Sequence, residues 1–200
     1  MFPLGTVLLP SMLLPLHVFE PRYRVLARRC VDGDGELGVV LIERGSEVGG
    51  GDTRCHVGTR ARVLQAAELE DGRWVLGLVG VERIRVDRWL PDDPYPRAEV
   101  SSFAGARAGP DALDRRHAVE RVLRRLLALK AELGEPAPPA TVALDPDPDV
   151  AAWQAAGLAA LGPFDAQRVL EAGAADDRLA LVASLLEDEA AVLAQRVAGG

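Results

Sequence analysis

The sequence has very few of the residues on which most catalytic and nucleotide-binding motifs depend. Its 200 residues include two cysteines, three histidines and a single lysine, Lys130. A P-loop needs its lysine within G-x-x-x-x-G-K-S/T, whereas Lys130 follows Ala128-Leu129 and precedes Ala131. A serine–lysine catalytic pair would have to use this same lysine, which lies on a leucine-rich segment with helical spacing. We therefore predict that the chain is not an enzyme and has no catalytic residues.

Metal-binding and cofactor-binding patterns are also missing from the sequence. The candidate metal ligands are His17, His56, His117, Cys30 and Cys55. They show no C-x-x-C or H-x-x-x-H spacing, and Cys55 and His56 are neighbours on an expected strand, where their side chains point to opposite faces. Gly33, Gly35 and Gly38 match G-x-G-x-x-G by letter, but they follow an expected helix and precede a strand, which reverses the dinucleotide-binding order. We expect no metal and no cofactor.

Composition and charge narrow the class of protein further. The net charge of −7 and the pI near 5.0 disfavour broad binding to nucleic-acid backbones, which usually requires a basic surplus. No apolar run approaches the roughly 20 residues that cross a bilayer, so we expect no membrane segment. The sequence shows no leader-like start, and two cysteines in a chain of this length favour thiols over a disulfide. These features predict a cytoplasmic protein.

The first 30 residues predict two short buried strands followed by a helix. The apolar runs Val7–Leu9 and Leu13–Leu16 are each closed by a proline, so they cannot join into one long helix. Pro21 suits the first position of a helix, and Glu20 places negative charge at the positive end of its dipole. Helical spacing then puts one set of side chains on a common buried face: Tyr23, Leu26, Ala27 and Cys30.

The stretch from residue 37 to residue 103 is rich in strand patterns. Leu37–Ile42 is a continuous apolar run typical of a buried strand, and residues 55–69 alternate as a half-exposed strand does. A triple glycine predicts a surface loop over residues 45–52. Residues 98–103 supply a last strand. Most of this stretch is therefore expected to form β-structure.

Two turn signals refine the expected sheet. Asp71-Gly72 predicts a tight hairpin before a strand over residues 74–86. The alternation of that strand slips in phase near Gly80, which predicts a β-bulge there. Six or so short strands with glycine kinks and one early helix suggest a small, partly closed β-barrel.

The C-terminal half predicts a helical bundle, so the fold class is α+β. A helix begins near Pro110 and ends at Gly134, and a proline-rich linker follows near residues 134–148. Three further helices are expected over residues 149–161, 163–172 and 175–197. We expect two domains, the barrel over residues 1–105 and the bundle over residues 106–200.

Several segments carry a resemblance to a known family. The opening FPLGTVLLPSMLLPLHVFEPRYRVL closely resembles the N-terminal, substrate-binding domain of Lon protease, above all its stand-alone bacterial form without ATPase and protease domains. The resemblance continues through GELGVVLIERGSEVG, VGTRARV, DGRWVLGLVGVERIRV and PYPRAEV, and it resumes in VLEAGAADDRLALVASLLEDE. It implies a PUA-like barrel and a non-catalytic module, an adaptor or client-recognition protein, that binds polypeptide segments or unfolded proteins. Lon protease itself is a candidate partner.

The candidate peptide-binding residues lie at the expected corner between strand and helix: His17, Phe19, Glu20, Arg22 and Tyr23. Two aromatic rings, a histidine and opposite charges at one corner can anchor and orient a polypeptide, and an exposed strand edge can pair with it. The competing interpretation is structural. In it, Phe19 and Tyr23 pack the helix on the barrel, while Glu20 and Arg22 stabilise the start of the helix.

An RNA-binding function is the alternative, because PUA-like barrels include RNA binders. Its best support is the densest basic cluster of the chain: Arg115, Arg116, Arg121, Arg124 and Arg125. That helix has no aromatic side chain to stack on bases, and acidic residues are interspersed along it. We therefore favour a solvated helix face over an RNA site and expect no nucleic-acid partner. The sequence leaves the oligomeric state open.

Overall fold

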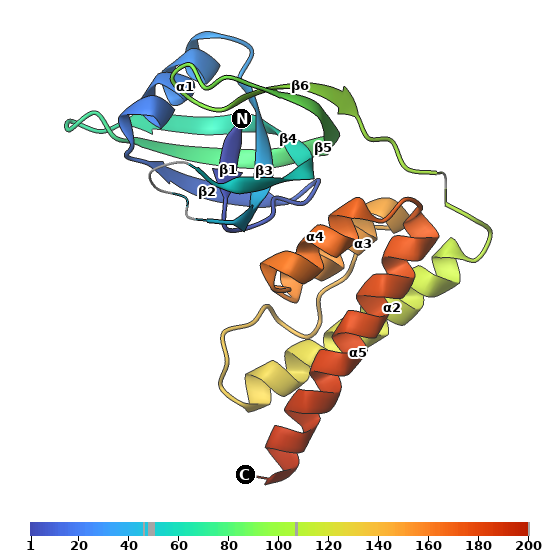
Figure 1. Ribbon diagram of the computed structural model, residues 1–200. Helices are drawn as coiled ribbons and strands as arrows, with labels where there is room; N and C mark the ends of the chain where they lie inside the picture. Colours follow the sequence, from blue (N-terminus) through green and yellow to red (C-terminus); the bar gives the residue numbers. More distant parts are fainter. Residues whose placement is uncertain (46, 48–50, 107, 200) are drawn as a thin grey trace. The chain divides into compact units, whose positions relative to one another are not determined.

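The computed structural model describes residues 1–45, 47, 51–106 and 108–199 (Figure 1). The chain is α+β, and its internal contacts divide it into two compact units, Met1–Ala104 and Gly105–Gly200. Within the described residues, the first unit contains β1 (Phe2–Leu4), β2 (Leu13–Val18), α1 (Pro21–Asp32), β3 (Glu36–Arg44), β4 (Thr53–Glu68), β5 (Trp74–Leu90) and β6 (Arg97–Ser102). The second contains α2 (Ala112–Glu132), α3 (Pro148–Leu158), α4 (Pro163–Glu171) and α5 (Ala175–Gly199).

The strands form one open sheet in the order β1-β3-β4-β5-β2, with β6 also paired to β5. The long strand β5 pairs with β2 along its first half and with β6 along its second half. Strand β1 joins β3 in parallel, but no ladder within the described ranges links β1 to β2 or to β6. The sheet is therefore not closed, because the three residues of β1 pair only with β3. The predicted partial closure into a PUA-like barrel is not confirmed.

Helix α1 has the start and the buried face that the sequence predicts. Pro21 occupies the first turn, and Glu20 precedes it with an extended backbone (φ −67°, ψ 137°) and no side-chain capping bond. The helix contacts β2, β4 and β5. Its buried residues are Tyr23, Leu26, Ala27 and Cys30. They share one core with residues of the sheet that include Phe2, Leu16, Val18, Val39, Leu76 and Leu78.

The prediction that Val7–Leu9 forms a strand is wrong. The first strand is Phe2–Leu4 instead, which pairs with β3. Leu8 and Leu9 are nonetheless buried, with 3% and 4% of their surface exposed, and the hydroxyl of Thr59 donates to the carbonyl of Leu8 at 2.5 Å. A short apolar run predicts burial, and here tertiary packing and a side-chain hydrogen bond hold the run without a ladder.

Leu13–Leu16 forms a strand as predicted, but its burial was predicted wrongly. Leu13 is 70% exposed, and only Leu16 and Val18 of β2 are buried. Within the described residues β2 pairs with β5 alone, and alternate residues of β2 (Leu13, Pro15 and His17) are exposed on one face. A run of leucines hides this alternation, because every position in it is apolar.

The turn between β4 and β5 forms as predicted at Asp71-Gly72, where Gly72 has φ +76°. This positive φ is the conformation that glycine adopts at little cost in a tight turn. Of the other predicted loop, over residues 45–52, residues 46 and 48–50 lie outside the described residues.

The bulge predicted near Gly80 is confirmed. Arg60 pairs with Glu82 while the next residue, Ala61, pairs with Gly80, so β5 carries one extra residue at this point. A Cβ on Gly80 would lie 2.3 Å from the carbonyl oxygen of Leu9. Any residue with a Cβ would clash with Leu9 at this position. Glycine is therefore required here, because it lets the backbone of Leu9 approach β5 closely.

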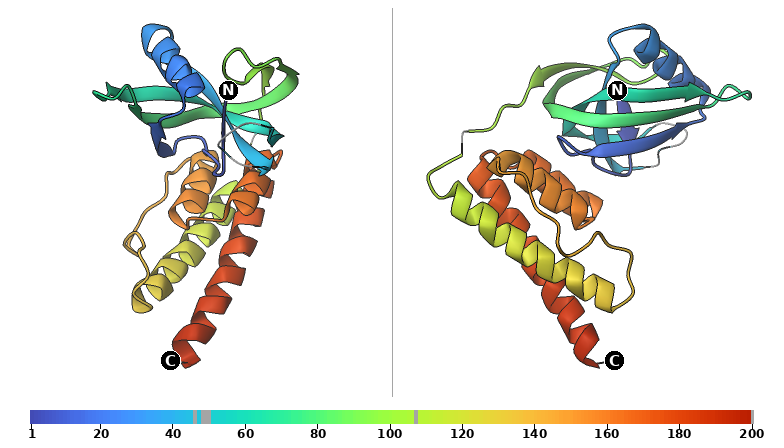
Figure 2. Two further views of the ribbon diagram at one scale, coloured as in Figure 1. Left: turned by 60° about the vertical axis from the view of Figure 1, so that its left-hand side comes forward. Right: turned by 180° about the vertical axis from the view of Figure 1, so that it is seen from behind.

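The second unit is built around α2 and α5, which run side by side in the same direction in both views (Figure 2). Arg115 lies 3.7 Å from Asp176 near the two helix starts, and Arg196 pairs with Glu135 at 2.7 Å near their ends. The predicted helices are present with ends that differ by a few residues, and Gly134 ends α2 with φ +72°. No helix in the described ranges combines the length and apolar character needed to cross a bilayer.

The proline-rich segment between α2 and α3 is tied to α2. Arg116 donates to the carbonyls of Leu144 and Asp145 at 2.5 and 2.7 Å, and the amide of Leu144 donates to Glu120 at 3.3 Å. Leu144 is 4% exposed. The predicted linker is therefore held in the second unit by the buried side chain of Leu144.

Candidate functional site

The five predicted site residues lie together where β2 ends and α1 begins, but they play different structural roles. Tyr23 belongs to the core, because it is 3% exposed and stacks on Phe2 with ring centroids 4.2 Å apart. Burial raises the pKa of Tyr23 to about 12. The Tyr23 ring therefore supports the corner from inside and leaves little of its surface to an incoming ligand.

The charged pair stabilises the helix start. Arg22 Nε lies 3.2 Å from Glu20 Oε2, and both side chains are largely buried, with 18% and 17% of their surface exposed. The Arg22 guanidinium also lies 4.5 Å from the ring centre of Tyr23 and donates to the carbonyl of Glu47 at 3.5 Å. These contacts match the structural interpretation for Glu20 and Arg22.

Phe19 and His17 point outward, in contrast to Tyr23. Phe19 is 52% exposed, so it does not pack the helix on the sheet as the structural interpretation required. Its carbonyl accepts a hydrogen bond from Arg24 Nε at 2.8 Å, which fixes the backbone from which the ring projects. His17 is exposed on β2 next to it.

Two small crevices flank Phe19, and His17 lines both. One is also lined by Phe2, Leu4 and Tyr23, and the other by Leu69, Arg73 and Trp74. Each has a volume of about 40 Å³. Because a water needs roughly 10–15 Å³ of such space, each crevice has room for a few waters or the tip of an apolar side chain. We call Phe19, His17 and these two crevices the Phe19 corner.

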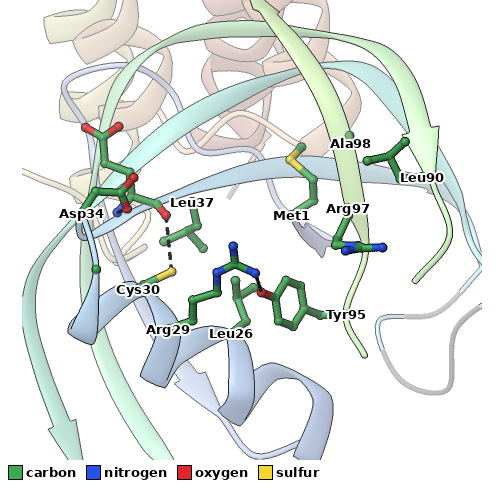
Figure 3. Close-up of a pocket in the computed structure, with 12 residues that line it drawn as sticks. Met1, Leu26, Arg29, Cys30, Asp34, Leu37, Leu90, Tyr95, Arg97 and Ala98 are labelled. Atoms are coloured by element: carbon green, nitrogen blue, oxygen red, sulfur yellow. Dashed lines mark hydrogen bonds between the residues drawn. The ribbon is translucent and has the colours of Figure 1, made fainter. Parts of the chain in front are cut away.

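A larger cleft of about 540 Å³ lies on another side of the first unit, between α1, the start of β3 and β6 (Figure 3). Arg29 Nη1 donates to the hydroxyl of Tyr95 at 2.9 Å across it. The sequence did not predict this cleft, because Arg29 and Tyr95 are 66 positions apart and form no motif. Burial raises the pKa of the Cys30 thiol, which lines the cleft and donates to the carbonyl of Glu36 at 3.4 Å. Cys30 and Cys55 are both thiols rather than disulfide partners, as predicted.

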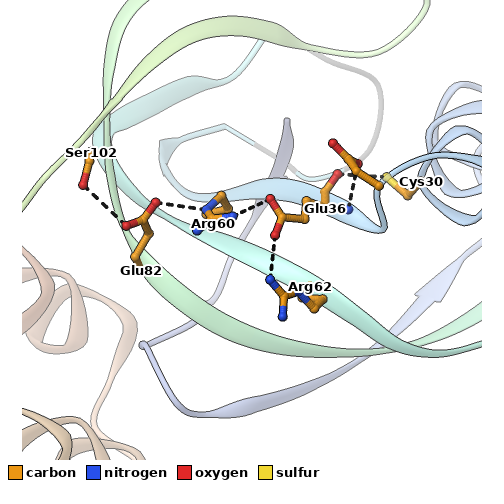
Figure 4. Close-up of polar contacts among 7 residues, drawn as sticks. Cys30, Glu36, Arg60, Arg62, Glu82 and Ser102 are labelled. Atoms are coloured by element: carbon orange, nitrogen blue, oxygen red, sulfur yellow. Dashed lines mark hydrogen bonds and ion pairs between the residues drawn. The ribbon is translucent and has the colours of Figure 1, made fainter.

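A row of polar side chains crosses strands β3 to β6 beside this cleft (Figure 4). Arg60 bridges Glu36 and Glu82 at 2.5 and 3.0 Å, Arg62 donates to Glu36 at 3.1 Å, and Ser102 donates to Glu82 at 3.4 Å. Hydrogen bonds from Arg60 and Arg62 lower the pKa of Glu36. The charge of Glu36 is thus compensated by two arginines.

The basic cluster on α2 is partly occupied by contacts inside its own unit. Arg116 and Arg124 both pair with Glu120, at 3.1 and 2.6 Å, and both donate to carbonyls of the proline-rich segment. These contacts lend no support to an RNA-binding surface on α2. Within the described residues, no group of three or more histidine, cysteine or acidic side chains is placed to hold a metal ion.

Comparisons with known proteins agree on one family. The model of the ATP-dependent protease La (LON) substrate-binding domain matches residues 1–188. The chain is 30% identical over 100 residues to a Lon protease of Desulfosudis oleivorans, a match that covers 48% of this chain and 12% of that protein. It is 28% identical over 127 residues to Lon protease 2 of Herpetosiphon aurantiacus, covering 62% and 15%. The chain thus spans only a small part of the length of these relatives.

Solved structures with the same fold include a Lon N-terminal domain protein from Xanthomonas campestris. It superposes with a TM-score of 0.64 at 26% identity and covers 92% of this chain and 95% of that one. The N-terminal domain of Mycobacterium avium complex Lon protease superposes with a TM-score of 0.68 over 93% and 97%, and its 16% identity speaks for the fold alone. With the family model matching residues 1–188, this chain belongs to the LON substrate-binding domain family.

Proposed function

We propose that this chain binds segments of unfolded polypeptides at the Phe19 corner and does not cut them. The observation that carries the proposal is the exposed ring of Phe19, held between two crevices on a backbone fixed by Arg24. Membership of a substrate-binding family supports it. The sequence contains no P-loop pattern, and it shows no pattern that pairs a nucleophile with a general base.

The geometry suits apolar side chains presented by an extended chain. Folded proteins bury most of their large apolar residues, whereas an unfolded segment presents them to solvent. Burying one such side chain contributes about 1.5–3 kcal/mol, so a single contact at the Phe19 corner is weak. Several contacts along one chain, or several modules on one partner, would strengthen the binding through effective concentration.

Pairing with a free strand edge is less suited to β2 than to β6. Pro15 lies in the middle of β2 and cannot donate a main-chain hydrogen bond. Strand β6, Arg97–Ser102, contains no proline and pairs with β5 on one side. We therefore assign the Phe19 corner to side-chain anchoring rather than to strand addition.

Several finer points stay predictions. We predict that the chain acts as an adaptor, that it functions together with Lon protease and that it is cytoplasmic. We also predict that the sheet is PUA-like and that the two units are separate domains. No specific observation favours the RNA-binding alternative.

The test is binding of reduced, carbamidomethylated α-lactalbumin, with folded α-lactalbumin as the control ligand. Because α-lactalbumin is acidic and the 200-residue chain has a net charge of −7, electrostatic attraction between the two does not drive binding. We expect binding of the unfolded form only, and a loss of about tenfold in affinity for Phe19→Ala, since tenfold corresponds to about 1.4 kcal/mol. Val25→Ala is the matched control, because Val25 is 49% exposed on α1 but lines neither crevice. Equal affinity of both variants and wild type would exclude the Phe19 corner.

A further inference from the structure

The cleft between α1 and β6 holds an arginine whose charge is not compensated nearby. Arg29 donates to the neutral hydroxyl of Tyr95, and within the part of the chain that the structure describes it forms no ion pair. Arg28, its neighbour on α1, points elsewhere and pairs with Glu68 at 2.5 Å. A guanidinium presents several donors in a planar fork, so Arg29 retains donors for an anion.

The other charges of the cleft are those of Glu36, Arg97, Asp34 and the ammonium of Met1, which donates to the carbonyl of Pro96 at 2.7 Å. Glu36 is already held by two arginines, as described above. Arg97 lies 3.7 Å from Asp93, beyond the length of a good hydrogen bond. Asp34 is the remaining acid, with one carboxylate oxygen accepting from the amide of Glu36 at 3.1 Å, and it lies at the opposite end of the cleft from Arg97 (Figure 3). Arg29 therefore favours a negative group in the cleft, and the surroundings of Asp34 do not.

The walls of the cleft suit an extended chain. Leu26, Leu37 and Leu90 line it and offer apolar surface, and Arg97 and Ala98 of β6 form one side. Within the described ranges, no strand pairs with the second edge of β6, so its main chain is able to bond to an added segment. The volume of about 540 Å³ lies inside the range of roughly 300–1,000 Å³ usual for ligand sites.

We propose that this cleft binds the carboxyl-terminal end of a polypeptide, with the terminal carboxylate on Arg29. The inference rests on the proposed function, because it assumes that the chain binds polypeptides and assigns their carboxyl-terminal end to this cleft as a second site. Guanidinium–carboxylate pairs are bidentate and strong among protein hydrogen bonds. Tyr95 acts as a positioning residue, because its hydroxyl holds the guanidinium across the cleft.

The test uses random decapeptides labelled at the amino terminus, in one pool with a free carboxyl terminus and in a matched pool with an amide. Wild type should bind the free-acid pool about tenfold more tightly, because a hydrogen bond to a charged group is stronger than one to a neutral group. Arg29→Gln should abolish this preference. Arg28→Gln removes the same charge from the same helix outside the cleft, and it should keep the preference. Tyr95→Phe keeps the charge of Arg29 but not its orientation, and it should reduce the preference in part.

Circular dichroism of each variant confirms that it is folded before binding is compared. Equal binding of both pools to wild type, or an undiminished preference in folded Arg29→Gln, would overturn the inference. If wild type still binds unfolded α-lactalbumin in that case, the proposed function stands and only the carboxylate site falls. If wild type binds neither peptides nor unfolded α-lactalbumin, both proposals fall together.

Discussion

Two aromatic residues, four positions apart, have different roles at the junction of β2 and α1. Tyr23 is buried against Phe2 and holds α1 on the sheet, while Phe19 is half exposed above two crevices. The sequence placed Tyr23 on the buried face of α1 through helical spacing, and the structure agrees. Phe19 precedes the helix and has no such periodicity to predict its side, so only the structure shows that it projects outward.

The buried phenol of Tyr23 predicts a loss of stability at high pH. Its pKa is raised from 10.0 to about 12 in the folded state, so the folded protein favours the neutral form. The stabilisation that the folded protein gains from the neutral Tyr23 phenol is fully present below pH 10. It is lost as the pH rises towards about 12, which lowers the free energy of unfolding by about 2–3 kcal/mol. Tyr23→Phe removes the ionisable group, and its free energy of unfolding should fall less over this range.

Urea unfolding of wild type and Tyr23→Phe at about pH 8, 10 and 11.5 measures this difference. Cys30, whose pKa burial also raises, is present in both proteins, so its own contribution cancels in the comparison. A decline of equal size in both would mean that the Tyr23 phenol ionises as readily in the folded protein as in the unfolded chain.

At the scale of the element, β5 depends on a bulge and a close backbone approach at Gly80. A Cβ at Gly80 would lie 2.3 Å from the carbonyl oxygen of Leu9, whereas one at Gly77 would have its nearest neighbour at 3.7 Å. Gly80→Ala should therefore lower the free energy of unfolding by about 2 kcal/mol or more, because Leu9 or the bulge must shift. Gly77→Ala on the same strand should change it by less than about 0.5 kcal/mol.

Equilibrium unfolding in urea compares the two variants directly. Similar stability of both would show that the segment from Leu8 to Pro10 moves away from β5 at little cost. The close approach at Gly80 would then not be needed for the fold.

Local signals predicted some elements well and missed others for identifiable reasons. Pro21 with the buried helical face, Asp71-Gly72 and the phase slip at Gly80 each reflect chemistry within a few residues, and each prediction is confirmed. The strand at Val7–Leu9 was wrong, because an apolar run reports burial without saying whether its main chain pairs with a neighbour. Closure of the sheet depends on the pairing of β1 with distant strands, which no local pattern encodes.

At the scale of the molecule, the sequence located one candidate site but not the other. The Phe19 corner comes from residues adjacent in the chain, and crevice residues Leu69 and Trp74 join it only through the pairing of β2 with β5. The cleft at Arg29 needs α1, β3 and β6 together. Family membership follows from the match over residues 1–188, whereas the class of ligand and the positions that contact it are proposals.

The most direct test of the central claim is amide hydrogen exchange of the full chain with and without reduced, carbamidomethylated α-lactalbumin. If unfolded polypeptide is anchored at the Phe19 corner, the backbone from His17 to Tyr23 and the β4–β5 turn beside Leu69 should exchange more slowly in the complex. The same peptides should be unchanged with folded α-lactalbumin. Protection confined to the helices of the second unit, with the corner exchanging at its free rate, would contradict the account.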